Sequence, residues 1–341
     1  MSHSKAIRPS LALEGDIVLC SLSGTIPGFV RPLALILLLS LSVKGWCVVE
    51  DAGQPGAYLL AGVGGRAGAM GNAYAALAEG PEAVYWNPAA LALGGPPALA
   101  STYNILSLGR QSDDAELQWS ALGSTGTAGS FPMDLNRGWG SWGLGWMGFS
   151  LGDDFEGRVS DTPGFYTFGD HEDEYALAHG RALLPWLALG VGLKLYDQTL
   201  SNYTAHGEGL DLGSLVLLGP WARLAVTAND LFSNFTWSTG DVERFPITLR
   251  ASLAASTLGG ALTMAFQAES VQNLVPDYSV GVEGRVFRFF RLRAGLQQYG
   301  FTFGGGASVP VAKMDCSLDY AYMPDPLDQG SQQRFSLDLS F

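Results

Sequence analysis

Apolar and polar residues alternate along this chain from about residue 97 to its last residue. The final segment shows the pattern most clearly, with Phe335, Leu337, Leu339 and Phe341 separated by Ser336, Asp338 and Ser340. A period of two residues is that of a β-strand with one apolar face. The pattern therefore predicts amphipathic strands paired in an antiparallel sheet.

About fourteen such segments follow one another along the chain. They lie near 98–108, 114–124, 139–151, 172–182, 187–198, 207–217, 221–230, 246–255, 259–269, 276–287, 290–299, 301–309, 311–322 and 332–341. Long connections and tight turns alternate, so the long ones are expected at one end of the sheet. The connection over 125–138 breaks this rule and suggests that a strand beside it is misplaced.

Composition separates the classes of protein that could contain these strands. The chain is 47% hydrophobic and only 15% charged, yet it has no apolar run of about 18 residues, which a spanning helix requires. A closed barrel of amphipathic strands also crosses a membrane. A soluble sandwich can alternate too, but its outer face would be rich in Lys and Glu. The polar face here carries Gly, Ser and charges of both signs, which predicts an all-β, transmembrane antiparallel β-barrel over 97–341.

Charged residues on the polar face of these strands are expected to point into the barrel lumen. We interpret them as a lattice of ion pairs and hydrogen bonds that fills the lumen, and a permeation path would use the same side chains. The residues are Lys194, Asp211, Arg250, Glu283, Arg285, Arg291, Arg293, Asp315 and Asp319. The formal net charge of −13 leaves no basic face for a nucleic acid, so no such partner is expected.

Residues 1–47 are predicted to be a signal region. The apolar run Leu33–Val43 is flanked by Arg31 and Lys44, and it is too short to span a membrane. Thirty residues precede Arg31, which is unusual for a signal peptide. We hypothesise a GTG start codon at Val30, with residues 1–29 a wrongly assigned extension. The alternative to a signal peptide is that the apolar run forms a buried strand or helix of a cytosolic domain. A mature start near Val48 leaves Cys316 alone, which excludes a disulfide framework or a cysteine metal site.

The segment 48–96 differs in composition from the strands that follow it. Small residues over Ala67–Ala78 predict a short helix that ends at Gly80. A helical turn over Glu82–Trp86 and a break at Asn87-Pro88 are expected next. A mostly helical plug inside the lumen fits this pattern better than a strand does.

The runs Arg66-Ala-Gly-Ala-Met-Gly-Asn-Ala-Tyr and Glu82-Ala-Val-Tyr-Trp-Asn-Pro-Ala89 resemble the N-terminal segment of the PorV/PorQ family, relatives of the FadL-type outer-membrane transporters. Shorter matches continue along the strands, so the resemblance covers about residues 60–341. It implies a fourteen-stranded barrel in the cell outer membrane with an N-terminal hatch. The hatch residues it implies are Arg66, Gly68, Met70, Gly71, Asn72, Tyr74, Tyr85, Trp86, Asn87, Pro88 and Ala89.

Two functions follow from this resemblance as expectations. The first is passive uptake of hydrophobic small molecules, with capture by outer aromatic residues, a shift of the hatch, and sideways release at a strand kink. The second is an accessory or shuttle role in a type IX-like protein secretion system, with exported protein as cargo. Expected partners are outer-membrane lipids and the barrel assembly machinery, which would read Phe341. The aromatic residues are Phe155, Phe165, Tyr166, Phe168, Phe232, Phe235 and Trp237.

Three weaker motifs point to other chemistry. Gly62-x-Gly64-x-x-Ala67 fits a dinucleotide fingerprint, but no strand precedes it and no βαβ unit follows. Gly148-x-Ser150-x-Gly152 fits a nucleophile elbow, which needs a helix directly afterwards. The acidic stretch around His171 fits a solvated loop, a cation site or an acid/base site. We therefore expect the protein to have no enzymatic activity and to bind no cofactor.

Overall fold

The structure, a computed structural model, describes residues 56–108, 119–131, 140–158, 165–257, 259–324 and 330–341. These residues belong to one compact unit, Val48–Phe341. The predicted signal region, the hypothetical start at Val30 and the first residues of the predicted hatch lie outside the described residues.

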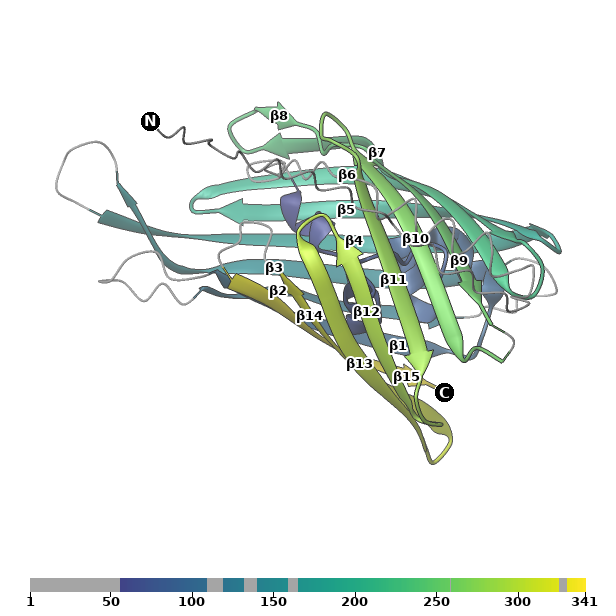
Figure 1. The fold of residues 1–341 in the computed structure, drawn as a ribbon. Coiled ribbons are helices and arrows are strands. Elements are labelled where there is room, and N and C mark those ends of the chain that lie inside the picture. The colour runs from purple at the N-terminus through teal and green to yellow at the C-terminus, as the bar shows by residue number, and fades with distance from the viewer. Residues whose placement is uncertain (1–55, 109–118, 132–139, 159–164, 258, 325–329) are drawn as a thin grey trace, which may run out of the picture. The chain divides into compact units, whose positions relative to one another are not determined.

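Fourteen long strands make up most of the described chain. Figure 1 shows how they lie side by side. They are β1 Ala98–Leu108, β2 Trp119–Phe131, β3 Ser141–Arg158, β4 Phe165–Leu184, β5 Leu187–Leu200, β6 Tyr203–Leu217, β7 Ala222–Trp237, β9 Thr248–Ser256, β10 Leu262–Val271, β11 Asp277–Arg285, β12 Phe290–Gln297, β13 Gly300–Val311, β14 Met314–Pro324 and β15 Gly330–Ser340. The two-residue strand β8, Val242–Glu243, pairs with β7. The predicted antiparallel sheet of about fourteen strands is confirmed.

Every long strand has a hydrogen-bonded neighbour on both sides. Consecutive strands pair antiparallel, β6 pairs with β7, and the first strand β1 pairs with the last strand β15 over eleven residue positions from Ala98↔Ser340 to Leu108↔Gly330. No long strand is therefore left with an open edge that could recruit a foreign strand.

One predicted strand was wrongly placed. The segment expected at 114–124 is β2, which runs over Trp119–Phe131. The connection to β3 therefore covers 132–140 instead of 125–138. The anomaly in the predicted turn pattern came from this misplacement.

The sheet is apolar outside and polar inside, the reverse of a soluble protein. Along β5, Leu193 is 56% exposed whereas its neighbour Lys194 is 4% exposed. Other strands repeat this arrangement, and their exposed apolar residues include Leu144, Leu195, Val226, Leu249, Tyr278, Leu292, Phe303 and Leu318. A continuous apolar exterior of this kind is a surface suited to lipid rather than water.

The hatch, here residues 56–96, consists of short helices inside the sheet. They are η1 Ala57–Ala61, α2 Gly65–Ala69, η2 Gly80–Glu82, α3 Ala83–Trp86 and η3 Pro88–Leu93. The expected helix over Ala67–Ala78 is wrong. Gly71 and Asn72 both have left-handed backbones, with φ of 65° and 61°, and the Asn72 amide bonds back to the Ala67 carbonyl. This closes α2 after one turn.

Glycines on the barrel wall let the hatch backbone approach the strands. A Cβ added at Gly281 of β11 would lie 2.6 Å from the Met70 Cβ, and one added at Gly190 of β5 would collide with the backbone of Pro88 and Ala89. The hatch therefore rests against two walls, α2 against β12–β15 and η3 against β4–β6. The high glycine content of the chain has a packing reason at these contacts.

A single glycine substitution tests this packing. We expect Gly281→Val to destabilise the folded protein by about 1–3 kcal/mol, because the added atoms overlap Met70 in a filled interior. Gly284→Val, in the same strand, is the control, since a Cβ at Gly284 meets nothing within 4 Å. Denaturant midpoints of the two variants measure the difference. Equal midpoints would contradict tight packing of the hatch.

Candidate functional site

A buried lysine and three carboxylates form the first polar centre of the interior, here called the lysine cluster. Lys194 Nζ lies 3.4 Å from Glu174, 3.1 Å from Asp211 and 3.0 Å from Asp230. All four side chains are buried. Because a buried charge is tolerated only when it is paired, the cluster can exist only as a unit.

A second cation, Arg250, continues this network toward the hatch. Its guanidinium donates to Asn229 at 3.0 Å and pairs with Glu269, and Asn229 in turn donates to Asp211 at 2.8 Å. Arg250 Cζ also lies 5.6 Å from the centre of the Trp86 ring in the hatch. At this distance the cation interacts favourably with the ring. One connected network therefore links the wall of the barrel to the hatch.

The strand that supplies Asp230 is distorted at this point. Asp230 and Phe232 of β7 have left-handed φ angles of 61° and 56°, and the β6–β7 ladder shifts register twice beside them. Such a backbone is costly for residues other than glycine. Here the Asp230 amide donates to Asp211 at 2.9 Å, so the distorted strand is held by the lysine cluster.

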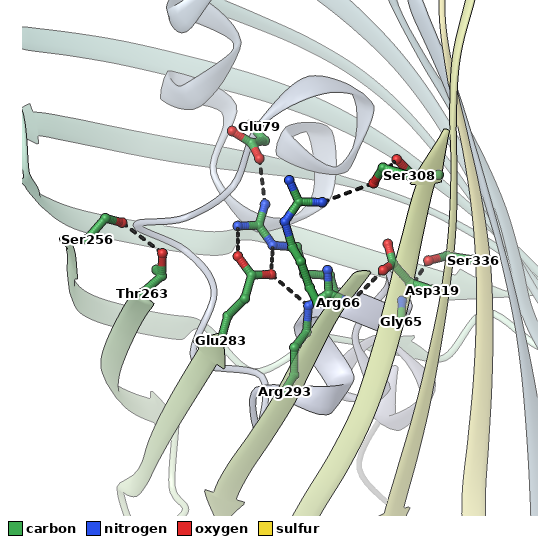
Figure 2. Close-up of polar contacts among 12 residues, drawn as sticks. Gly65, Arg66, Glu79, Ser256, Thr263, Glu283, Arg293, Ser308, Asp319 and Ser336 are labelled. Atoms are coloured by element: carbon green, nitrogen blue, oxygen red, sulfur yellow. Dashed lines mark hydrogen bonds and ion pairs between the residues drawn. The ribbon is translucent and has the colours of Figure 1, made fainter. Parts of the chain in front are cut away.

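Arg66 of the hatch forms the second polar centre, here called the arginine cluster (Figure 2). Its Nε and Nη2 atoms donate to the two oxygens of Glu283 at 2.9 and 3.0 Å, and Nη1 pairs with Glu79 at 2.5 Å. Arg293 approaches Glu283 at 2.7 Å and Asp319 at 2.5 Å. A planar guanidinium that grips a carboxylate with two parallel bonds fixes its orientation. This cluster attaches the hatch to β11, β12 and β14.

Arg334 makes polar contacts with the hatch, and the sequence analysis did not name this residue. Its side chain, on β15, is 0% exposed and donates to the carbonyls of Gly64 and Ala61 and to the Asn72 side chain. Among the described residues it has no carboxylate partner within 4 Å. Arg334 has the same strand parity as Ser336 and Asp338, so the alternation pattern contained the signal.

Glu82 is a second missed residue, buried in the hatch beside Gly64. Burial, and then the negative charge of Asp338, raise the pKa of its carboxyl to about 8. Its Oε1 atom has no hydrogen-bond partner in the described part of the chain. Burial of this carboxyl therefore favours its neutral form.

A cavity of about 1280 Å³, here called the vestibule, opens at the tight-turn end of the barrel below the hatch. Arg285, Arg291 and Asp315, which we expected in the lumen lattice, line this vestibule. Arg285 and Asp315 are exposed and Arg291 is half-buried, so these residues face the lumen where it opens to solvent. They lie near the ends of their strands, where the interior widens to solvent. Lys194, Asp211, Arg250, Glu283, Arg293 and Asp319 lie buried inside.

Aromatic side chains fill the interior toward the long-connection end. Phe245 packs at 4.5 Å from Tyr196 and 5.2 Å from Phe235, between ring centres, and Trp237 lies 5.6 Å from Phe235. These four residues are called the aromatic cluster. Tyr196 also donates to Asp230 at 2.5 Å, which places the cluster directly against the lysine cluster.

The expected outer aromatic surface is only partly present. Phe232 is 82% exposed, but Phe235 is buried and Trp237 is half-buried. Phe235 follows the strand distortion at Asp230 and Phe232, which sequence alternation could not anticipate. The side chains of Phe155, Phe165, Tyr166 and Phe168 lie outside the described residues.

The hatch residues named from the sequence lie at the centre of the interior. Asn87 donates to the carbonyls of Ala75 and Ser214 and accepts from the Ala89 amide, which fixes the predicted break at Asn87-Pro88. Trp86 donates to the Val63 carbonyl at 3.0 Å. Arg66 and Asn72 are half-buried, and the buried members are Gly68, Met70, Gly71, Tyr74, Tyr85, Trp86, Asn87, Pro88 and Ala89.

Ser150 and His171 are brought together by the β3–β4 ladder. The Ser150 hydroxyl lies 2.7 Å from His171 Nδ1 on the exposed side of the sheet. Ser150 is inside a continuous strand rather than at a strand-to-helix turn, so no nucleophile elbow forms. Among the described residues, nothing orients the other ring nitrogen of His171 in the way that a catalytic triad requires.

The described residues hold neither a metal-binding group nor a helix that could span a membrane. They contain no group of three or more His, Cys, Asp or Glu side chains arranged to hold a metal ion. None of the helices in that part of the chain is long and apolar enough to cross a membrane.

Solved structures with a similar fold are FadL-type barrels. A Pseudomonas aeruginosa FadL homologue matches with a TM-score of 0.54 and 11% identity, covering 82% of this chain and 98% of its own. The Pseudomonas putida toluene transporter TodX matches at 0.53 and 13%, covering 82% and 97%. The CymD monoaromatic hydrocarbon channel matches at 0.54 and 14%, covering 83% and 98%.

No protein-family model and no curated protein sequence matches the chain. At these low identities the structural likeness shows the fold alone. The chain thus has a FadL-like fold, with fourteen antiparallel strands around a short helical segment.

Removing the central lysine tests the lysine cluster. We expect Lys194→Met to destabilise the protein by about 3–5 kcal/mol, because three buried carboxylates lose their shared cation. Lys313→Met is the control, because Lys313 lies exposed in a tight turn. The temperature at which the folded species unfolds in detergent measures both. Equal temperatures for the two variants would show that the cluster is not essential to the fold.

Proposed function

We propose that this chain is an outer-membrane barrel that takes up hydrophobic small molecules passively. The observation that carries the proposal is the arrangement of the sheet. Its strands expose apolar side chains on the outside, and their polar side chains surround the hatch on the inside. Outer-membrane lipids would then contact the apolar exterior. The exposed terminal Phe341 would be read by the assembly machinery. The structural neighbours are described as a toluene transporter and a monoaromatic hydrocarbon channel, which supports the same chemistry for this chain.

The aromatic cluster is the proposed capture site. It is a group of packed rings directly beside the charged lysine cluster, and it lies at the end where the long connections emerge. Phe245 comes from the connection after β8 and contacts rings on both β5 and β7. Displacing this one ring would expose an apolar pocket of the kind that binds small hydrophobic ligands.

The route beyond the capture site is proposed to run sideways. Straight passage to the vestibule would cross the buried charges of the lysine cluster and the closely packed hatch. The β2–β3 ladder is interrupted between the pairs Gly123↔Phe149 and Thr127↔Trp146. A mostly apolar cavity of about 40 Å³ beside this wall is lined by Val84, Tyr85, Trp146 and Met147, among others. A shift of the hatch would join this cavity to the gap in the ladder.

A reversible lock on the hatch tests the uptake proposal. A Cβ added at Gly68 would lie 3.2 Å from the Ala321 Cβ, close to the disulfide range of about 3.5–4.5 Å. In a Cys316→Ser background, we expect the oxidised variant Gly68→Cys/Ala321→Cys to bring labelled fatty acid into liposomes no faster than empty liposomes do. Reduction should restore the uptake of the parent protein.

Two comparisons complete this experiment. The single variant Gly68→Cys controls for the substitution itself and should transport in both redox states. Unchanged uptake by the oxidised double variant would rule out a moving hatch. Parent protein that transports no faster than empty liposomes would overturn the uptake proposal as a whole.

A second proposed function is the binding of exported protein, in the manner of the PorV/PorQ family that the hatch sequence resembles. The observation that favours it is the length of β3 and β4, 18 and 20 residues, where about 9–11 suffice to cross a bilayer. Figure 1 shows these two strands extending past their neighbours. A projecting hairpin offers strand backbone to a protein partner.

Shortening this hairpin separates the two proposed functions. If the chain is a secretion shuttle, purification from outer-membrane extract should yield a stoichiometric protein partner, and deleting 156–167 should abolish its recovery. If the chain is an uptake channel, the deletion should leave liposome uptake unchanged. Absence of any stoichiometric partner with the intact protein would argue against the shuttle role.

A further inference from the structure

Two arginines face each other directly at the mouth of the vestibule. In the β11–β12 ladder, Arg285 is the cross-strand partner of Arg291. Like charges directly opposite each other on antiparallel strands destabilise the pairing. The preceding pair on the same face, Glu283↔Arg293, has opposite charges and forms a salt bridge at 2.7 Å. The hairpin therefore changes from a compensated pair to an uncompensated one as it enters the vestibule.

The other residues in the described part of the chain do not neutralise these arginines. Arg285 donates to the Gly259 carbonyl, and Arg291 donates to the Ser308 hydroxyl at 3.0 Å. No described carboxylate lies within 4.0 Å of either guanidinium. Of the carboxylates that line the vestibule, Glu79, Glu283 and Asp319 are already paired with Arg66 or Arg293. Asp315 and Asp338 also line it and form no ion pair with Arg285 or Arg291 within 4.0 Å.

Hydroxyl groups beside the arginines add hydrogen-bonding capacity. Ser308 accepts from Arg291, and it also accepts from the Ser317 hydroxyl at 2.8 Å. Its own hydroxyl hydrogen is therefore available to a ligand. Figure 2 shows Ser308 beside the arginine cluster.

We propose that Arg285, Arg291 and Ser308 form an oxyanion-binding site that takes a carboxylate or phosphate group. Guanidinium groups suit such anions, because their donors match two oxygens at once. A bound oxyanion would remove the repulsion between the two arginines. The vestibule, at about 1280 Å³, also has room for a larger molecule that carries the group. This site is independent of the proposed uptake, since it lies on the other side of the hatch.

Binding to purified full-length protein tests the site. Two probes at matched ionic strength distinguish the source of the group: inorganic phosphate, and a hexapeptide of glutamates. We expect calorimetry to detect binding of at least one probe, and the double variant Arg285→Gln/Arg291→Gln to weaken that binding by tenfold or more. Binding of phosphate alone would indicate a free ion, and stronger binding of the peptide would indicate an acidic polypeptide.

The control removes an arginine elsewhere. Arg244→Gln changes an exposed residue outside the vestibule and should leave binding unchanged. Without added anion, the double variant should unfold at the same temperature as the parent protein or higher, because the repulsion is gone. Phosphate or peptide should raise the unfolding temperature of the parent only. Failure of both probes to bind, or equal binding by parent and double variant, would overturn the proposal.

Discussion

Most charged side chains inside the barrel are buried in compensated groups, and this constraint organises much of the structure; Arg334 is held instead by carbonyls and an amide oxygen. Apolar side chains cover the exterior, so the polar face of every strand must be accommodated within. Lys194 holds three carboxylates, and Arg66 and Arg293 share Glu283. Each group draws its members from several strands, so none of them is complete until the barrel has formed.

The hatch depends on the same constraint. Its short helices have few hydrogen bonds of their own, and barrel side chains supply several of the missing partners. Gln267 accepts from the amides of Tyr74 and Ala75, and Ser336 accepts from the amide of Gly65. Glycines on the wall allow the backbone to come close enough for such bonds. The hatch is therefore a segment whose conformation is set by the barrel around it.

This arrangement gives the two ends of the interior different chemistry. The aromatic cluster lies at the long-connection end and contacts the lysine cluster through Tyr196. The vestibule lies at the tight-turn end and carries uncompensated arginines. An apolar ligand and an anionic group would thus be held in separate places, with the hatch between them.

Alternation along the chain was enough to predict the strands, because a period of two residues is a local property. Thirteen of the fourteen strands lie close to where alternation predicted them, and the polar parity identified the buried Lys194, Asp211 and Arg250. The helix expected over Ala67–Ala78 did not form. Small residues are compatible with a helix, but they are equally compatible with an irregular chain packed against glycines. The tertiary structure alone decided which charges meet. Arg334 reaches the carbonyls of Ala61 and Gly64 across about 270 residues of sequence, and Arg285 and Arg291 differ from Arg293 only in their depth in the barrel. Pairing of this kind depends on distances between strands, which no local pattern contains.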